Sequence, residues 1–126
     1  MASGGAGGDP AAEIAALIDH IATRLRRFGS RHWRDSLGPA GESAAELVWH
    51  AIVWCARAEA ELDPGRPPNA PRLPERAAYD AALADQLAVV GRDLAMSAVH
   101  ADQSHAEALL AHLRQLARTL KVESKP

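Results

Sequence analysis

Apolar residues recur every three or four positions in four separate stretches of this 126-residue chain, the spacing that places them on one face of an α-helix. No stretch shows the strict alternation of apolar and polar residues that is typical of a half-buried strand. The pattern predicts helices over residues 11–28, 44–62, 74–99 and 105–121. The predicted core positions are Ile14, Leu17, Ile18, Ile21, Leu25 and Phe28; Leu47, Val48, Ala51, Cys55, Ala58 and Leu62; Tyr79, Leu83, Leu87, Val90 and Leu94; and Leu109, Leu110, Leu113, Leu116 and Leu120.

Two Ser-x-x-Glu sequences mark the starts of the second and fourth helices. In such a capping box the serine hydroxyl accepts a hydrogen bond from the amide three residues on, and the glutamate accepts one from the amide of the serine. The boxes are 43–46 and 104–107. They predict that His50 lies in the second turn of its helix and that His105 is the first residue of its helix.

The four helices are predicted to form one domain, an all-α four-helix bundle over residues 11–121. Residues 1–10 are rich in glycine and are predicted to be a disordered tail, and residues 122–126 a C-terminal tail. At the end of the first tail, Asp9 and Pro10 fit an N-cap followed by a first helical residue, and Gly29 fits the C-cap of the same helix.

The connection between the second and third helices decides how the chain runs through the bundle. Residues 63–73 contain four of the eight prolines. An extended proline-rich segment rises ~3 Å per residue, so about eleven residues span ~30 Å, which is the length of a 20-residue helix. The connection can therefore turn tightly, which gives an up-down-up-down order, or cross the bundle, which gives an up-down-down-up order. The sequence leaves both orders open.

Composition indicates the class of protein and its location. The hydrophobic fraction of 48% and the charged fraction of 24% are those of a soluble globular protein. No apolar run approaches 18 residues and the N-terminus lacks the features of a secretion signal, so we expect neither a membrane span nor export. The single cysteine, Cys55, suits a reducing cytoplasm. The excess of arginine over lysine, with the high alanine content, indicates a GC-rich bacterial genome.

Three histidines are the candidate metal ligands. In the up-down-up-down order His50, His100 and His105 would gather at one end of the bundle. Three neutral imidazoles hold a divalent metal such as Zn, Ni or Fe and leave a position open for a small-molecule substrate. The alternative is that they are unrelated surface histidines. The sequence has no glycine-rich phosphate loop, paired-cysteine motif or Ser-His-Asp order, so it identifies no catalytic residue.

Two segments resemble a known family. Trp33, residues 37–39 (Leu-Gly-Pro) and residues 45–51 (Ala-Glu-Leu-Val-Trp-His-Ala) look like the start of the second helix in DinB-like proteins. Residues 105–114 (His-Ala-Glu-Ala-Leu-Leu-Ala-His-Leu-Arg) resemble the last helix of that family. The family includes the actinobacterial mycothiol-dependent isomerases.

This resemblance implies a four-helix bundle with a three-histidine divalent metal site that often acts on thiol adducts, and hence a thiol-linked transferase or isomerase. By position, His50 and His105 match two of the ligands. The third position falls on Ala101, next to His100. The resemblance covers the second and fourth helices only.

A second hypothesis is a non-catalytic interaction module. On the helix over residues 44–62, Trp49, Ile52 and Val53 point away from the predicted core line. An exposed apolar patch of this kind usually marks a partner surface. We expect the partner to be a second copy of the chain, which gives a homodimer. Cys55 lies on the inward side and is interpreted as a small buried hydrophobe.

A third hypothesis is an anion-binding or nucleic-acid-binding segment. Residues 24–34 contain five arginines and no acidic residue, and Trp33 is available to stack on a base. The chain as a whole carries a net charge of −2, so the remainder is acidic and would repel a polyanion. Nucleic acid is therefore less favoured as a partner than a small-molecule ligand or a second copy of the chain.

Overall fold

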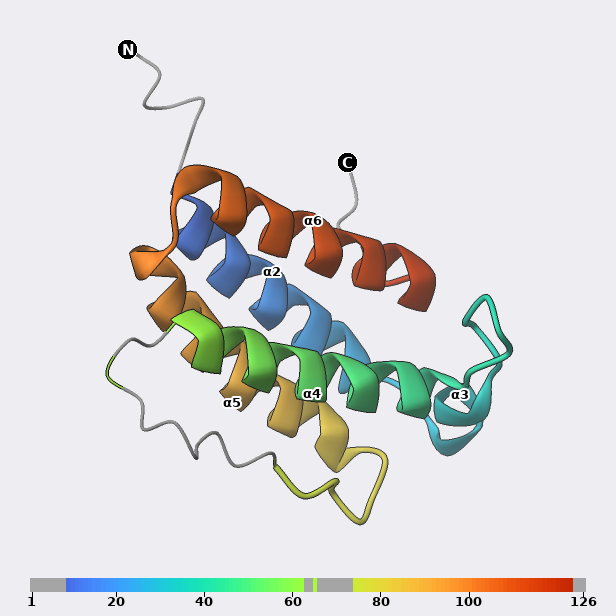
Figure 1. Cartoon of the computed structure of the whole chain (residues 1–126). Helices are drawn as coiled ribbons and strands as arrows, with labels where there is room; N and C mark the ends of the chain where they lie inside the picture. The colour runs from blue at the N-terminus through green and yellow to red at the C-terminus, as the bar shows by residue number, and fades with distance from the viewer. Residues whose placement is uncertain (1–8, 63–64, 66–73, 124–126) are drawn as a thin grey trace.

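The computed structural model describes residues 9–62, 65 and 74–123, and most of them are helical (Figure 1). Within these residues there is no strand, and one isolated bridge pairs Ser36 with Ser43. The prediction of an all-α fold is confirmed. The elements are α2 (Pro10–Leu25), α3 (Ser30–Arg34), α4 (Ala44–Leu62), α5 (Ala82–Ser97), the 3₁₀ turn η1 (Ala98–His100) and α6 (Gln103–Leu120).

Parts of three predicted segments lie outside the described residues. These are residues 1–8 of the first tail, all but residue 65 of the connection over 63–73, and residues 124–126 of the second tail.

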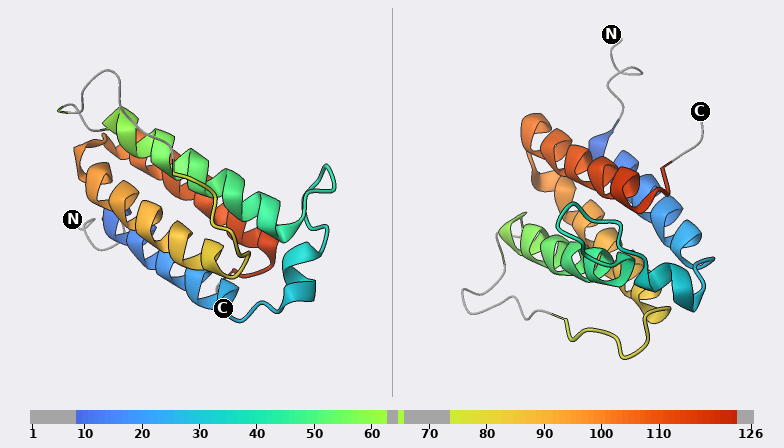
Figure 2. Two further views of the ribbon diagram at one scale, coloured as in Figure 1. Left: turned by 90° about the horizontal axis from the view of Figure 1, so that it is seen from below. Right: turned by 90° about the vertical axis from the view of Figure 1, so that its right-hand side faces the viewer.

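The four long helices pack side by side around one apolar core. α5 packs along both α2 and α4, and α6 packs along α2 (Figure 2). α2 and α6 run in one direction, and α4 and α5 run in the other (Figure 1). α4 therefore ends, and α5 begins, at opposite ends of the helices. α4 and α6 are antiparallel, and their backbones come close at only a few places.

The helix starts follow their capping residues, with one difference from prediction. The box at 43–46 forms as expected: the Glu46 amide donates to Ser43 Oγ at 3.1 Å, and the Ser43 amide donates to Glu46 Oε1 at 2.9 Å. The prediction of a capping box at 104–107 is wrong. Asp102 caps α6 instead, accepting from the His105 amide at 2.8 Å. Aspartate is as good an N-cap as serine, and its charge suits the positive end of the helix. His105 is therefore the third residue of α6 and not the first.

The first and third helices are shorter than predicted. Asp9 caps α2 as expected, but α2 ends at Leu25, and Gly29 is the N-cap of the short helix α3, which the sequence pattern did not predict. Gly29 has a φ of −82°, so it adopts no conformation that requires glycine. The third helix begins at Ala82 and not at residue 74. Tyr79, predicted to face the core, lies before that helix and is 78% exposed.

The core is apolar throughout, and α2 and α5 approach each other closely within it. No buried polar or charged residue occurs among the described residues. Gly91 of α5 faces Ile18 of α2 so closely that a Cβ at Gly91 would lie 2.6 Å from two of the Ile18 side-chain carbons. This close approach joins α2 to α5; α5 also packs on α4, and α2 on α6, so α2 and α5 lie on one side of the core and α4 and α6 on the other (Figure 2).

Two residues outside the predicted helices also pack into the core. Trp33 of α3 is 2% exposed and its ring meets the edge of Phe28, with ring centroids 5.3 Å apart. Val122, predicted to belong to the C-terminal tail, is 2% exposed, and its carbonyl accepts a hydrogen bond from His20 Nε2 at 2.8 Å.

Candidate functional site

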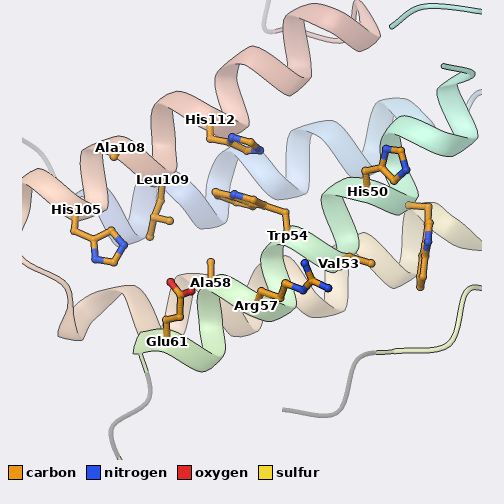
Figure 3. Close-up of a pocket in the computed structure, with 11 residues that line it drawn as sticks. His50, Val53, Trp54, Arg57, Ala58, Glu61, His105, Ala108, Leu109 and His112 are labelled. Atoms are coloured by element: carbon orange, nitrogen blue, oxygen red, sulfur yellow. The ribbon is translucent and has the colours of Figure 1, made fainter. Parts of the chain in front are cut away.

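A groove runs between the neighbouring helices α4 and α6. It is crossed by one pair of side chains: Trp54 reaches from α4 toward α6, and the imidazole of His112 lies against the indole (Figure 3). The ring centroids are 3.9 Å apart and the planes differ by 10°, so the rings are stacked. The two residues are far apart in sequence, and only the packing of the helices brings them together.

The stacked pair stands between two cavities. The larger one has a volume of about 820 Å³ and extends toward His105 and Glu61; Trp49, Val53 and Arg57 also line it. The smaller one has a volume of about 380 Å³ and is lined on its far side by Leu47, Gln115, Leu116 and Thr119. Three residues line both cavities: Trp54, His112 and His50.

The spacing of residues on the two helices explains why this seam stays open. On α6, His105, Ala108 and His112 share one face at intervals of three and four residues. On the facing side of α4, Trp54 is followed one turn later by Ala58. Small and polar side chains therefore occupy positions where large aliphatic residues would close a helix seam, and Trp54 alone bridges the distance to the stacked imidazole.

The electrostatic surroundings define which groups are charged. Partial burial lowers the pKa of the His112 imidazole, although the residue as a whole is exposed, so this ring is neutral at neutral pH. The hydrogen bond from the Ser43 amide is the main cause that lowers the pKa of Glu46, near the start of α4. Arg57 and Glu61 are exposed at the rim of the larger cavity and supply one charge of each sign. Burial raises the pKa of Cys55 to about 12, so its thiol is protonated at neutral pH and is neither a nucleophile nor a metal ligand there.

The three histidines predicted as metal ligands do not come together. His50 and His105 both lie near the starts of their helices, and because α4 and α6 are antiparallel these positions are at opposite ends of the groove (Figure 3). His100 lies in η1, is exposed and lines neither cavity. Among the described residues no three His, Cys, Asp or Glu side chains form a group that could hold a metal ion. The residues present therefore do not fit a three-histidine site.

The three residues of the predicted partner surface do not lie together: two line the groove and the third lies in the core. Trp49 and Val53 are half-buried and line the larger cavity. Ile52 is 0% exposed and belongs to the core, so it does not widen a surface patch.

In the arginine-rich segment over residues 24–34, Trp33 is buried and so is not available to stack on a base. Its Nε1 has no hydrogen-bond partner within the described residues.

Several residues of the site were not predicted from the sequence: His112, its partner Trp54, and the charged Arg57 and Glu61. For His112 the signal was present, because His112 lies two turns after His105 on the same face of a strongly amphipathic helix. It became informative only when the structure placed Trp54 opposite.

No family model, curated protein or solved structure matches the chain. None of the helices in the described part of the chain is long and apolar enough to cross a membrane.

Proposed function

We propose that the protein is a non-catalytic four-helix bundle of up-down-down-up order that binds a small aromatic acid in the groove between α4 and α6. The observation that carries the proposal is the stacked pair of Trp54 and His112 with a cavity on each side. Both cavity volumes, about 820 Å³ and about 380 Å³, fall in the range of ~300–1,000 Å³ that is typical of small-molecule sites.

The lining residues support a planar ligand with an acidic group. Trp54 and Trp49 supply aromatic surface against which a flat ring can stack. The guanidinium of Arg57 supplies the planar donor fork that matches a carboxylate. Glu61, one turn further along α4, can accept a hydrogen bond from a ring N–H. Heteroaromatic acids combine these features.

The proposal is tested by titrating the protein with indole-3-acetate and following the three tryptophan indole N–H signals by ¹⁵N NMR. Saturable shifts are expected for Trp54 and Trp49, whereas Trp33, which lines neither cavity, is the internal reference. Tryptophol, which has the same ring and no acid, is the matched probe. Arg57→Gln should weaken the binding of indole-3-acetate about tenfold, as expected for a lost charge-assisted pair, and leave tryptophol unaffected. Unchanged Trp54 and Trp49 signals up to 10 mM indole-3-acetate would overturn the proposal.

The remaining hypotheses from the sequence stay predictions. They are a DinB-like thiol-linked enzyme with a divalent metal on His50, His100 and His105, a homodimer that uses α4, and an anion site in residues 24–34. The separation of His50 and His105 along the groove gives the metal hypothesis no support, and metal analysis tests it directly. A cytoplasmic location and a bacterial source also stay predictions.

A further inference from the structure

We propose that, before a ligand binds, the His112 imidazole occupies the position on Trp54 that the aromatic ring of the ligand takes. The aromatic ring of the bound acid displaces the imidazole from Trp54, and this displacement joins the two cavities into one continuous groove. The inference rests on the proposed function and adds to it how the ligand is seated and what shape it has.

The geometry of the pair is that of a ligand on a platform. The His112 ring lies 3.9 Å from the Trp54 ring at an angle of 10°, which is the arrangement a bound aromatic ring would adopt. Trp54 is the fixed member, because it is half-buried and packs against the apolar core. A ring that replaced His112 would find this platform already in position.

His112 is the member that can leave. Within the described part of the chain, its imidazole makes no hydrogen bond or ion pair, and the stack is its one specific contact. His112 is on the exposed side of α6, so a change of its side-chain torsion angles moves the ring into solvent without moving the helix. Water can then satisfy both ring nitrogens.

Removing the imidazole from the stack changes the shape of the site. Trp54, His112 and His50 line both cavities, so together they form the boundary between them, and His112 is its part that stands on α6. With His112 turned outward, the larger cavity with Arg57 continues into the smaller one, which offers Gln115 and Thr119. The ligand that fits is therefore elongated: an aromatic ring in the middle, an acid toward Arg57, and a polar substituent toward Gln115 and Thr119.

The experiment compares His112→Ala with a matched control, His105→Ala. Both histidines are exposed residues of α6 that line the larger cavity, but only His112 stacks on Trp54. If His112 competes with the ligand, His112→Ala should bind indole-3-acetate about five-fold more tightly, since aromatic pairs have about this strength and tenfold in affinity corresponds to ~1.4 kcal/mol. His105→Ala should stay within two-fold of the unmodified protein. Trp54→Ala should weaken binding at least tenfold, and Trp54→Phe, which keeps a ring, should retain most of it.

A second His112 variant and the NMR signals of the His112 ring distinguish failure of the displacement from failure of the proposed function. His112→Gln removes the ring and keeps a polar side chain, so it should also tighten binding; circular dichroism checks that each variant is folded. In the unmodified protein, the ¹³C-labelled His112 ring signals should move to solvent-exposed values as indole-3-acetate saturates. If indole-3-acetate shifts Trp54 but neither His112 variant binds it more tightly, the displacement is wrong and the groove still binds ligand. If the unmodified protein and both variants leave Trp54 unshifted, the proposed function itself fails.

Discussion

Replacement of Gly91 by alanine tests the close contact between α2 and α5. An alanine Cβ at this position would lie 2.6 Å from Ile18 Cδ1, 2.6 Å from Ile18 Cγ2 and 2.8 Å from Ile18 Cγ1. Ile18 is 1% exposed, so its side chain has no open space into which it can turn. Either α2 moves away from α5, or Ile18 adopts an unfavourable rotamer.

Two opposing effects decide the size of the change. Alanine is favoured over glycine inside a helix by ~1 kcal/mol. Adding a methyl group to a filled core costs ~1–3 kcal/mol, and three contacts below 3.0 Å place Gly91→Ala at the upper end of that range. The expected net loss is ~2 kcal/mol in the free energy of unfolding, which lowers the melting temperature by roughly 5–10 °C in a domain of this size.

Urea unfolding followed by circular dichroism measures this loss. Gly29→Ala is the control, because a Cβ at Gly29 meets nothing within 4 Å, and its effect should be smaller than that of Gly91→Ala. Ile18→Ala removes all three of the clashing carbons, so a double-mutant cycle of Ile18→Ala with Gly91→Ala should show a favourable coupling of at least ~1 kcal/mol. A Gly91→Ala protein as stable as the unmodified one, or a loss that is unchanged in the Ile18→Ala background, would refute the reasoning.

Four further outcomes are expected. Because burial lowers the pKa of His112 in the folded protein, the unfolded state binds more protons as the pH falls below the ordinary value of 6.5. The free energy of unfolding should therefore be highest above pH 6.5 and decrease as the pH falls below it, and His112→Gln should reduce that decrease in pH-dependent urea titrations; an identical pH profile in both proteins would contradict the assignment. Ser43→Ala removes the hydroxyl that caps α4, so the free energy of unfolding should fall by ~1 kcal/mol, whereas Ser43→Thr should stay close to the unmodified protein in the same assay. If the DinB-like hypothesis holds, purified protein saturated with Zn, Ni or Fe and then desalted should retain metal that His50→Ala loses, and elemental analysis that finds no metal would remove it. If α4 mediates a homodimer, Trp49→Glu should convert dimer to monomer in sedimentation experiments with the helical content intact, and a monomer already at tens of micromolar unmodified protein would exclude it.

The local structure followed closely from the sequence wherever capping and apolar periodicity agreed. α4 begins and ends at the predicted residues because the box at 43–46 leaves a single choice of N-cap and the apolar stripe continues to Leu62. At the start of α6 two residues, Asp102 and Ser104, could serve as the N-cap, and the helix is capped by Asp102. Before α5, the predicted helix started too early, because the period of apolar residues extended back to Tyr79 although that side chain lies on the surface.

The candidate site depended on the order of the helices, which the sequence left open. The connection at 63–73 was long enough for either order. A tight turn would have gathered His50, His100 and His105 at one end. The direction in which α5 actually runs separates the first of these from the other two and sets α4 antiparallel to α6.

The sequence by itself therefore determined the four long helices, most of their boundaries and most of the residues that form the core, because these depend on contacts three or four positions apart. Only the tertiary structure decided that Trp54 meets His112, that a cavity lies on each side of them, and that Ile52 and Trp33 are buried. Contacts of this second kind join residues on different helices. They depend on the direction and spacing of those helices, which follow from how the whole core packs and not from any one segment.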